Sequence, residues 1–263
     1  MTVHACEMFP DDQTWDAIYD AIEQGESLSW PAMTLHLEPQ DTSLPGWKAL
    51  LQLVEDAASD RRETFSPKKE LGAELWEQVV TLPQSIAKLK HVKKLDLYRS
   101  SLLRVPPEIG AMESLEEFVP YTSYGLHWFP YEITRCRRLK SSTVSTRALY
   151  GNHKYRQPFP SLESIVVGLV PERCSVCDGP IDSNRVEQRW VSLGVATDVL
   201  PLLVNACSAP CVAKLPTPPE GYVQVPHKGG LSVQQPLAEI VERLGPSGAV
   251  ETTRSGHSRS EVA

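Results

Sequence analysis

The stretch from residue 80 to residue 167 repeats a proline- and leucine-based pattern about every 23 residues. Each copy opens with an apolar residue, a proline, two variable residues and an isoleucine. A second block then places apolar residues at its first, fourth and sixth positions. The openings begin at Leu82, Val105 and Phe129, and the second blocks begin at Val92, Leu115, Leu139 and Leu162. A fixed period of about 20 to 29 residues predicts a solenoid, in which each repeat packs on its neighbours.

This pattern resembles leucine-rich repeat proteins whose repeat opens Leu-Pro-x-x-Ile-x-x-Leu, and the resemblance covers residues 80–170. It implies an α/β solenoid with a parallel sheet and a role in binding. The alternative, a chance pattern in an amphipathic helix, is disfavoured because the proline and isoleucine positions keep register. Ser142 stands where a core leucine belongs, which predicts irregular later coils. The position that usually carries asparagine or cysteine holds Ser100, Ser123, Arg147 and Val170, and of these the serines can serve as internal hydrogen-bond acceptors.

Four of the six cysteines form two close pairs, Cys174-x2-Cys177 and Cys207-x3-Cys211. Four thiolates in this spacing suit a tetrahedral zinc ion, and the arrangement over residues 173–216 resembles treble-clef zinc fingers. Because four thiolates close the coordination shell, we expect one structural zinc ion per chain. Unliganded buried cysteines and a disulfide are the alternatives. His227 is an alternative outside ligand, although we interpret it as an exposed loop histidine.

The sequence predicts an α/β fold: a leucine-rich repeat solenoid with a parallel sheet, a helical N-terminal cap and a small zinc-binding module. The cap is predicted to contain a helix over 11–24, a strand over 33–37 and a helix over 46–58, from apolar spacing. Pro236 opens a last amphipathic helix. The predicted segments are 1–79 for the cap, 80–170 for the repeats, 171–245 for the zinc module and C-terminal helix, and 246–263 for a disordered tail.

Alternate residues of each second block are expected to point outward from the sheet as a partner-binding face. Equivalent positions should lie side by side, so Tyr98 should neighbour Tyr121 and Lys94 should face Glu117. Exposed tyrosines are common anchors of interfaces. The alternative is that the two tyrosines only pack against each other. The outward sets are Lys94, Asp96 and Tyr98; Glu117, Val119 and Tyr121; Ser141, Thr143 and Ser145; and Ser164, Val166 and Gly168.

The connection over residues 146–158 is longer than a repeat needs, and it is basic and aromatic. Long insertions in compact folds are often functional loops. We therefore add Tyr150, His153 and Tyr155 to the predicted partner-binding residues. The alternatives are a loop that covers the end of the solenoid and, from the same composition, a contact to single-stranded nucleic acid.

The formal net charge of −7 disfavours a nucleic-acid backbone as the main partner. The sequence shows no secretory signal and no apolar run that would span a membrane, which predicts a cytoplasmic protein. Gly-x-Ser-x-Gly, phosphate-loop and His-Glu-x-x-His motifs are absent. We therefore expect a non-catalytic protein-binding module, serving as an adaptor, a scaffold or an inhibitor. The alternative is a nucleic-acid-binding protein that uses the zinc module and the 146–158 loop.

Overall fold

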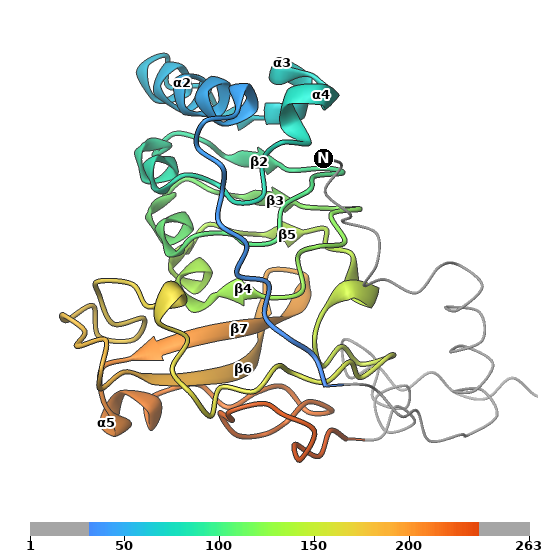
Figure 1. The fold of residues 1–263 in the computed structure, drawn as a ribbon, viewed down its shortest axis with the longest axis vertical. Helices are drawn as coiled ribbons and strands as arrows, with labels where there is room; N and C mark the ends of the chain where they lie inside the picture. Colours follow the sequence, from blue (N-terminus) through green and yellow to red (C-terminus); the bar gives the residue numbers. More distant parts are fainter. Residues whose placement is uncertain (1–31, 237–263) are drawn as a thin grey trace, which may run out of the picture.

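Four short parallel strands form the first sheet, in the order β1 (Thr64–Phe65), β2 (Lys94–Asp96), β3 (Glu117–Val119) and β5 (Ser141–Ser142) (Figure 1). This computed structural model describes residues 32–236, so the predicted helix over 11–24, the helix opened by Pro236 and the tail after 246 lie outside them. Lys94 pairs with Glu117, and Glu117 pairs with Ser141. The sequence period of 23 to 24 residues is thus the register of a parallel sheet in a mixed α/β fold.

The sheet begins one strand earlier and ends one strand earlier than the repeat pattern predicts. β1 pairs with β2 although no Leu-Pro opening precedes it, and we did not predict it. Residues 162–167 were predicted as a fourth strand, which is wrong. Ile165 and Val167 are 38% and 65% exposed, and a short 3-10 helix, η5 (Val167–Leu169), follows. The apolar spacing of this block therefore does not reflect strand burial.

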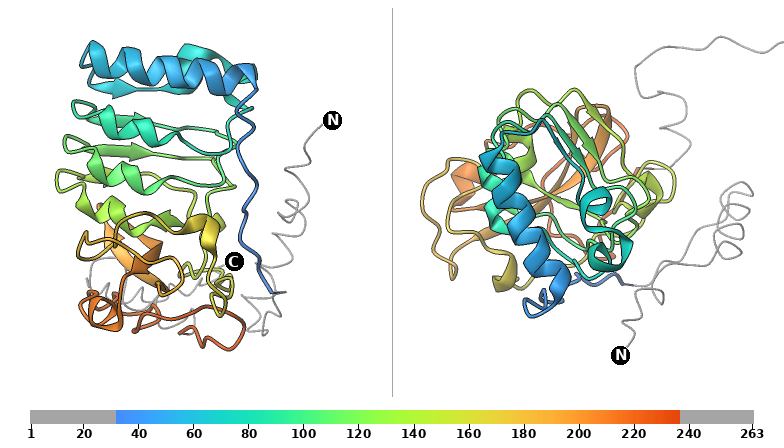
Figure 2. Two further views of the ribbon diagram at one scale, coloured as in Figure 1. Left: turned by 60° about the vertical axis from the view of Figure 1, so that its left-hand side comes forward. Right: turned by 90° about the horizontal axis from the view of Figure 1, so that it is seen from above.

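Short 3-10 helices form the side of the molecule opposite the sheet (Figure 2). Each of the first three follows a proline in extended conformation, which fixes where the helix begins. Gly110 lies where η2 packs against η3, and a Cβ there would meet the Glu132 carbonyl oxygen at 2.5 Å. Close packing of the two helices therefore requires glycine. The helices are η1 (Gln84–Lys88), η2 (Pro107–Ala111), η3 (Tyr131–Arg135) and η4 (Thr146–Ala148).

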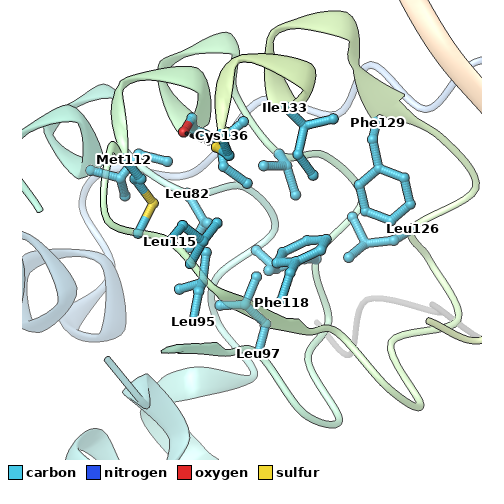
Figure 3. Packing of buried hydrophobic residues seen from close by; sticks show 14 of the residues in the cluster. Leu82, Leu95, Leu97, Met112, Leu115, Phe118, Leu126, Phe129, Ile133 and Cys136 are labelled. Atoms are coloured by element: carbon cyan, nitrogen blue, oxygen red, sulfur yellow. Dashed lines mark hydrogen bonds between the residues drawn. The ribbon is translucent and has the colours of Figure 1, made fainter. Parts of the chain in front are cut away.

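The hydrophobic core lies between the strands and the 3-10 helices (Figure 3). Repeat positions fill it in layers, and burial of each large apolar side chain contributes about 1.5–3 kcal/mol. One buried cluster continues from Leu50 to Cys211, across both internal boundaries that the sequence suggested. Its labelled members in Figure 3 are Leu82, Leu95, Leu97, Met112, Leu115, Phe118, Leu126, Phe129, Ile133 and Cys136.

Helix α2 (Pro45–Ser59) covers the N-terminal end of the stack, over the predicted span, and Pro45 stands in its first turn. Leu50 and Val54 are fully buried on its inner face. Two short helices, α3 (Pro67–Leu71) and α4 (Ala73–Trp76), complete this end. The helices therefore bury an apolar edge that the first strand would otherwise expose.

Residues 32–44, the strap, run along the stack rather than within it (Figure 1). The Arg104 guanidinium donates to the carbonyl oxygens of His36 (2.7 Å) and Glu38 (2.6 Å). The Gln40 side chain donates to the Gln78 carbonyl at 3.1 Å and accepts from a neighbouring backbone N–H. The predicted strand over 33–37 is wrong. The segment is extended, but it is held by side-chain hydrogen bonds to successive layers and not by backbone hydrogen bonds to a neighbouring strand.

A long antiparallel hairpin closes the other end of the stack. Its strands are β6 (Glu187–Val195) and β7 (Asp198–Ala206), and β7 pairs in parallel with β4 (Phe129–Pro130). Phe129 lies opposite Leu202, so the hairpin joins the stack where the third repeat opens. The hairpin therefore provides the C-terminal cover that the open end of a stack requires.

Ser142 occupies a core leucine position because the tip of the hairpin bonds to it. The Ser142 hydroxyl lies 2.6 Å from Oδ2 of Asp198 and 3.0 Å from the Val195 carbonyl oxygen. The Ser142 backbone N–H donates to the Thr197 hydroxyl, which donates in turn to the Ser142 carbonyl oxygen at 2.7 Å. A leucine would keep the two backbone bonds but would remove the hydroxyl partner of the half-buried Asp198 carboxylate and of the Val195 carbonyl oxygen.

Serines also satisfy the turns that follow the strands. The buried Ser123 hydroxyl donates to the Leu97 carbonyl oxygen at 2.9 Å and accepts from the Ser100 backbone N–H at 3.0 Å. In the next layer the Ser145 hydroxyl accepts from the Thr122 N–H at 2.8 Å. Ser145, predicted to point outward, is buried and takes the role that Arg147 cannot fill.

We expect Ser142→Ala to lower the free energy of unfolding by about 1–3 kcal/mol, because it leaves half-buried polar groups of the hairpin tip unpaired. Denaturant unfolding monitored by tryptophan fluorescence measures this change. Ser141→Ala, one residue away on the outer face, is the matched control and should change stability by less than about 0.5 kcal/mol. Equal stability of the two variants would contradict the capping role of Ser142.

Buried His127 lies between the strap and the hairpin end. Its ring stacks on Tyr150 (5.1 Å between centroids) and on His36 (5.6 Å), and Nδ1 donates to the Ala148 carbonyl oxygen at 2.6 Å. Burial lowers the pKa of His127 to about 4 and, likewise, the pKa of His227. Both rings are therefore neutral in the folded protein at pH 7.

We expect stability to fall as the pH drops from about 6.5 to about 4, because the unfolded chain binds protons that these folded histidines exclude. His127 alone accounts for about 3 kcal/mol over this window. His127→Phe should flatten the dependence by about half, since His227 still titrates. Unfolding curves collected between pH 4 and 7 measure it. An unchanged slope in His127→Phe would refute the assignment.

Candidate functional site

Two pairs of cysteines that are far apart in sequence meet at the base of the hairpin. The sulfur atoms of Cys174, Cys177, Cys207 and Cys211 all lie within 4.8 Å of one another. Cys207 Sγ is 3.6 Å from both Cys177 Sγ and Cys211 Sγ, well beyond the roughly 2.05 Å of a disulfide. Within residues 32–236 this is the one group of His, Cys, Asp and Glu side chains compact enough to hold a metal ion.

A tight turn presents the first pair of sulfurs. The Cys174 N–H donates to the Gly179 carbonyl oxygen at 2.7 Å, and the Asp178 N–H donates back to the Cys174 carbonyl oxygen at 3.0 Å. Asp178 has a left-handed φ of 59°, a conformation that aspartate tolerates in tight turns. Its carboxylate is 2.9 Å from Arg173 and 3.3 Å from Arg135.

The second pair follows β7 directly. Cys207 is the residue after the strand, and Cys211 lies in the short helix α5 (Ala209–Val212), whose backbone turns back to Ser208. The two pairs are joined through Ser175, whose backbone and hydroxyl bond the backbone of Asn205, both at 2.9 Å. The strand therefore sets the second pair in register with the first.

The backbone around Cys174 favours a thiolate. Burial raises its pKa, but N–H groups of Val176, Cys177 and Cys207 point at the sulfur from 3.3–3.5 Å, and the net effect lowers the pKa to about 7. Desolvation and the neighbouring thiols instead raise the pKa of Cys211 to about 12. Four thiols this close cannot all lose their protons without a cation, because the four negative charges would repel one another. A bound metal ion supplies the compensating positive charge.

His227 and Cys136 also carry metal-ligating atoms, and neither belongs to this group. His227 is half-buried rather than exposed: its ring meets Phe159 edge-on at 4.6 Å and its Nδ1 accepts from the Gly229 N–H, so it is not grouped with the four sulfurs. Cys136 is buried in the core, as its repeat position predicts, and its thiol donates to the Ile109 carbonyl oxygen at 3.2 Å.

The predicted partner-binding face is partly assembled on the sheet. Tyr98 and Tyr121 stack with their centroids 6.3 Å apart, and they remain 44% and 47% exposed. Lys94 Nζ lies 2.7 Å from a carboxylate oxygen of Glu117. The side chains of Asp96 and Val119 are half-buried between these residues, and Thr143 is exposed directly after β5.

One residue of this face was missed by sequence reasoning. The Lys68 ammonium lies 5.4 Å from the centroid of the Tyr98 ring, and Asp96 is held by the Ser66 hydroxyl at 2.8 Å. Both Lys68 and Ser66 follow β1, a strand that the repeat pattern does not mark. If the exposed–buried alternation of Thr64 and Phe65 had been recognised as a strand, Ser66 and Lys68 would have been predicted at the edge of this face.

The 146–158 connection does not present the predicted aromatic surface. Tyr150 and Tyr155 are 1% and 4% exposed, so their assignment as partner-binding residues is wrong. Tyr150 packs against Trp190 and Phe159 in a second hydrophobic cluster under the strap. Asn152 accepts two backbone N–H bonds that fold the connection into a tight turn, leaving His153 exposed.

No protein-family model matches the sequence, and a search of curated proteins finds none that matches it. Function therefore has to be inferred from the residues of the site and their geometry. Among the residues that the structure describes, no helix has both the length and the apolar character needed to cross a bilayer.

We expect purified protein to contain about one metal ion per chain, and Cys177→Ser to lose it. Elemental analysis after gel filtration measures the content. Cys136→Ala, which alters a thiol outside the group, is the control and should keep the ion. Chelation should also lower the thermal midpoint, because the ion joins the hairpin base to the Cys174 turn. A stable, metal-free protein would rule the site out.

Proposed function

We propose that this protein is a non-catalytic protein-binding module built as a leucine-rich repeat solenoid, with one structural zinc ion. The observation that carries the proposal is the exposed, stacked pair of Tyr98 and Tyr121 on adjacent parallel strands. Stacked aromatic side chains on a rigid sheet lose little conformational entropy on binding and are typical interface anchors. The strand register and the 3-10 helices support the family resemblance.

The surroundings of the tyrosine pair support a binding surface of moderate polarity. Val119 extends the apolar centre, while Lys68 and the Lys94–Glu117 pair provide charge at its edge. Interfaces commonly combine an aromatic centre with a polar rim of this kind. Ionic pairs on the exposed face contribute about 0–1 kcal/mol to stability, so they are better suited to orienting a partner than to holding the fold.

Zinc is the metal we propose for the cysteine group. Four thiolates in two close pairs favour tetrahedral zinc. Zinc has no redox chemistry, and its d electrons impose no geometry of their own. The closed set leaves no open position for a substrate. We therefore assign the ion the role of fastening the hairpin that covers the end of the stack.

Nucleic-acid binding is the alternative. A net charge of −7 and the burial of Tyr150 and Tyr155 weaken it, since little remains of the aromatic loop on which it depended. The exposed Arg147, His153 and Lys154 are its remaining surface.

A tagged-protein pull-down with and without nuclease separates the two functions. We expect one protein to be retained at near-stoichiometric yield after nuclease treatment and Tyr98→Ala/Tyr121→Ala to lose it by a factor of about ten or more, as for paired hot-spot residues. Tyr124→Ala, another exposed tyrosine, is the matched control. Retention that depends on nucleic acid, or that is unchanged in the double variant, would overturn the proposal.

A further inference from the structure

A groove of about 1070 Å³ runs along the side of the molecule that carries the 3-10 helices. It extends from Trp47 of α2, past the openings of the three repeats, to residues 168–173 beside the Cys174 turn. Neither the sheet face nor the cysteine group uses this surface. Its volume is in the range of sites that hold small ligands or a short peptide segment.

Equivalent residues of the three repeats line the groove with unpaired oxygens. Ser85, Glu108 and Glu132 line the groove, and each directly precedes the isoleucine of its repeat opening. Within the described part of the chain, Ser85 Oγ, Glu108 Oε2 and Glu132 Oε2 are buried and have no hydrogen-bond partner. The repeat register thus places one unsatisfied acceptor in each of three successive layers.

Glu132 is the most informative of the three. Its side chain is 3% exposed, and it lines the groove with an oxygen that no donor reaches. Burial raises its pKa, partly offset by the Ser175 hydroxyl and the nearby Arg135, and burial also raises the pKa of Glu108. Burying a carboxylate without a full set of donors is costly, so such a group is retained where a ligand completes it.

The basic side chains that line the groove are already bonded to other acceptors. Arg104 donates to two strap carbonyls, and Arg135 donates to the carbonyls of Cys174 and Ser175. Lys90 contacts Glu113 and the Ala111 carbonyl. Arg173 is paired with Asp178. Within the described residues, the carboxylates of the groove that form no ion pair are Glu108, Glu132 and the exposed Glu172, which gives the groove a preference for a positive ligand.

We propose that this groove binds an organic cation, an ammonium or guanidinium group, between Glu108 and Glu132. Glu108 and Glu132 lie on the adjacent helices η2 and η3, and the Glu108 charge contributes to raising the pKa of Glu132, so one planar guanidinium can donate to both carboxylates. A metal ion fits less well, since within residues 32–236 the groove offers no third acidic group close enough to complete a metal site. The cation could belong to a lysine or arginine side chain of a peptide or to a free amine.

Carboxyl-carbon NMR of the full chain labelled at glutamate tests the proposal. The probes are an acetylated Ala-Arg-Ala amide, putrescine and calcium chloride, each titrated at constant ionic strength. We expect saturable shifts of the Glu108 and Glu132 carboxyl signals with an organic cation. Glu132→Gln and Glu108→Gln should each weaken binding by about tenfold or more, as expected for loss of a charge-assisted hydrogen bond.

Glu113→Gln is the matched control, because Glu113 lines the same groove but is exposed and paired with Lys90. It should bind as the native protein does, and so should Tyr98→Ala/Tyr121→Ala, which makes this site independent of the proposed sheet interface. Thermal midpoints of the near-isosteric glutamine variants confirm that they fold. Tighter binding of the peptide or of putrescine identifies the source of the cation.

Three results would overturn the proposal. These are the absence of saturable shifts with either organic cation, an affinity in both glutamine variants equal to that of the native protein, or the same shifts with calcium chloride. The first would mean that the buried oxygens are satisfied by water alone, and the last that the groove is an inorganic cation site.

Discussion

A stack of short parallel strands has two open ends, and covering those ends is the constraint on which this structure depends. Each strand is bonded along both edges only inside the stack, so the first and last layers would expose apolar side chains and unpaired backbone groups. Helix α2 covers the first end with Leu50 and Val54. The β6–β7 hairpin covers the other, pairing through Phe129 and Leu202 and bonding Ser142 at its tip. The strap then crosses the layers from outside through Arg104.

The cysteine group lies at the base of the same hairpin, opposite the tip that bonds Ser142. Ser175 joins the Cys174 turn to β7 through Asn205, and Cys207 follows that strand directly. An ion bound there would fix the base of the hairpin while Asp198 and Thr197 fix its tip. A bound ion would thus act on the parallel strands through the β6–β7 pair, which joins them at β4.

The sequence predicts what depends on periodicity and close spacing, and it fails where tertiary contacts decide. The 23-residue period gives the strand register, the Tyr98–Tyr121 neighbours and the cysteine group, because each follows from local spacing. β1 was missed because no Leu-Pro opening precedes it. The fourth block failed because the hairpin already occupies the end of the stack, which leaves Val167 exposed. Tyr150 looked like a loop aromatic, but packing under the strap buries it, and no local pattern records that contact.

The same period aligns equivalent residues on two sides of the core. On the strand side it aligns Tyr98 with Tyr121, and on the helix side it aligns Glu108 with Glu132. Both pairs therefore have the spacing of one layer, and a rigid core between them holds each spacing fixed. A repeat whose side chains served packing alone would place apolar residues before each isoleucine. Ser85, Glu108 and Glu132 are polar there, and burying them costs stability. The groove therefore carries buried polar groups without partners, whereas the sheet carries exposed tyrosines. The two surfaces differ in chemistry as well as in position.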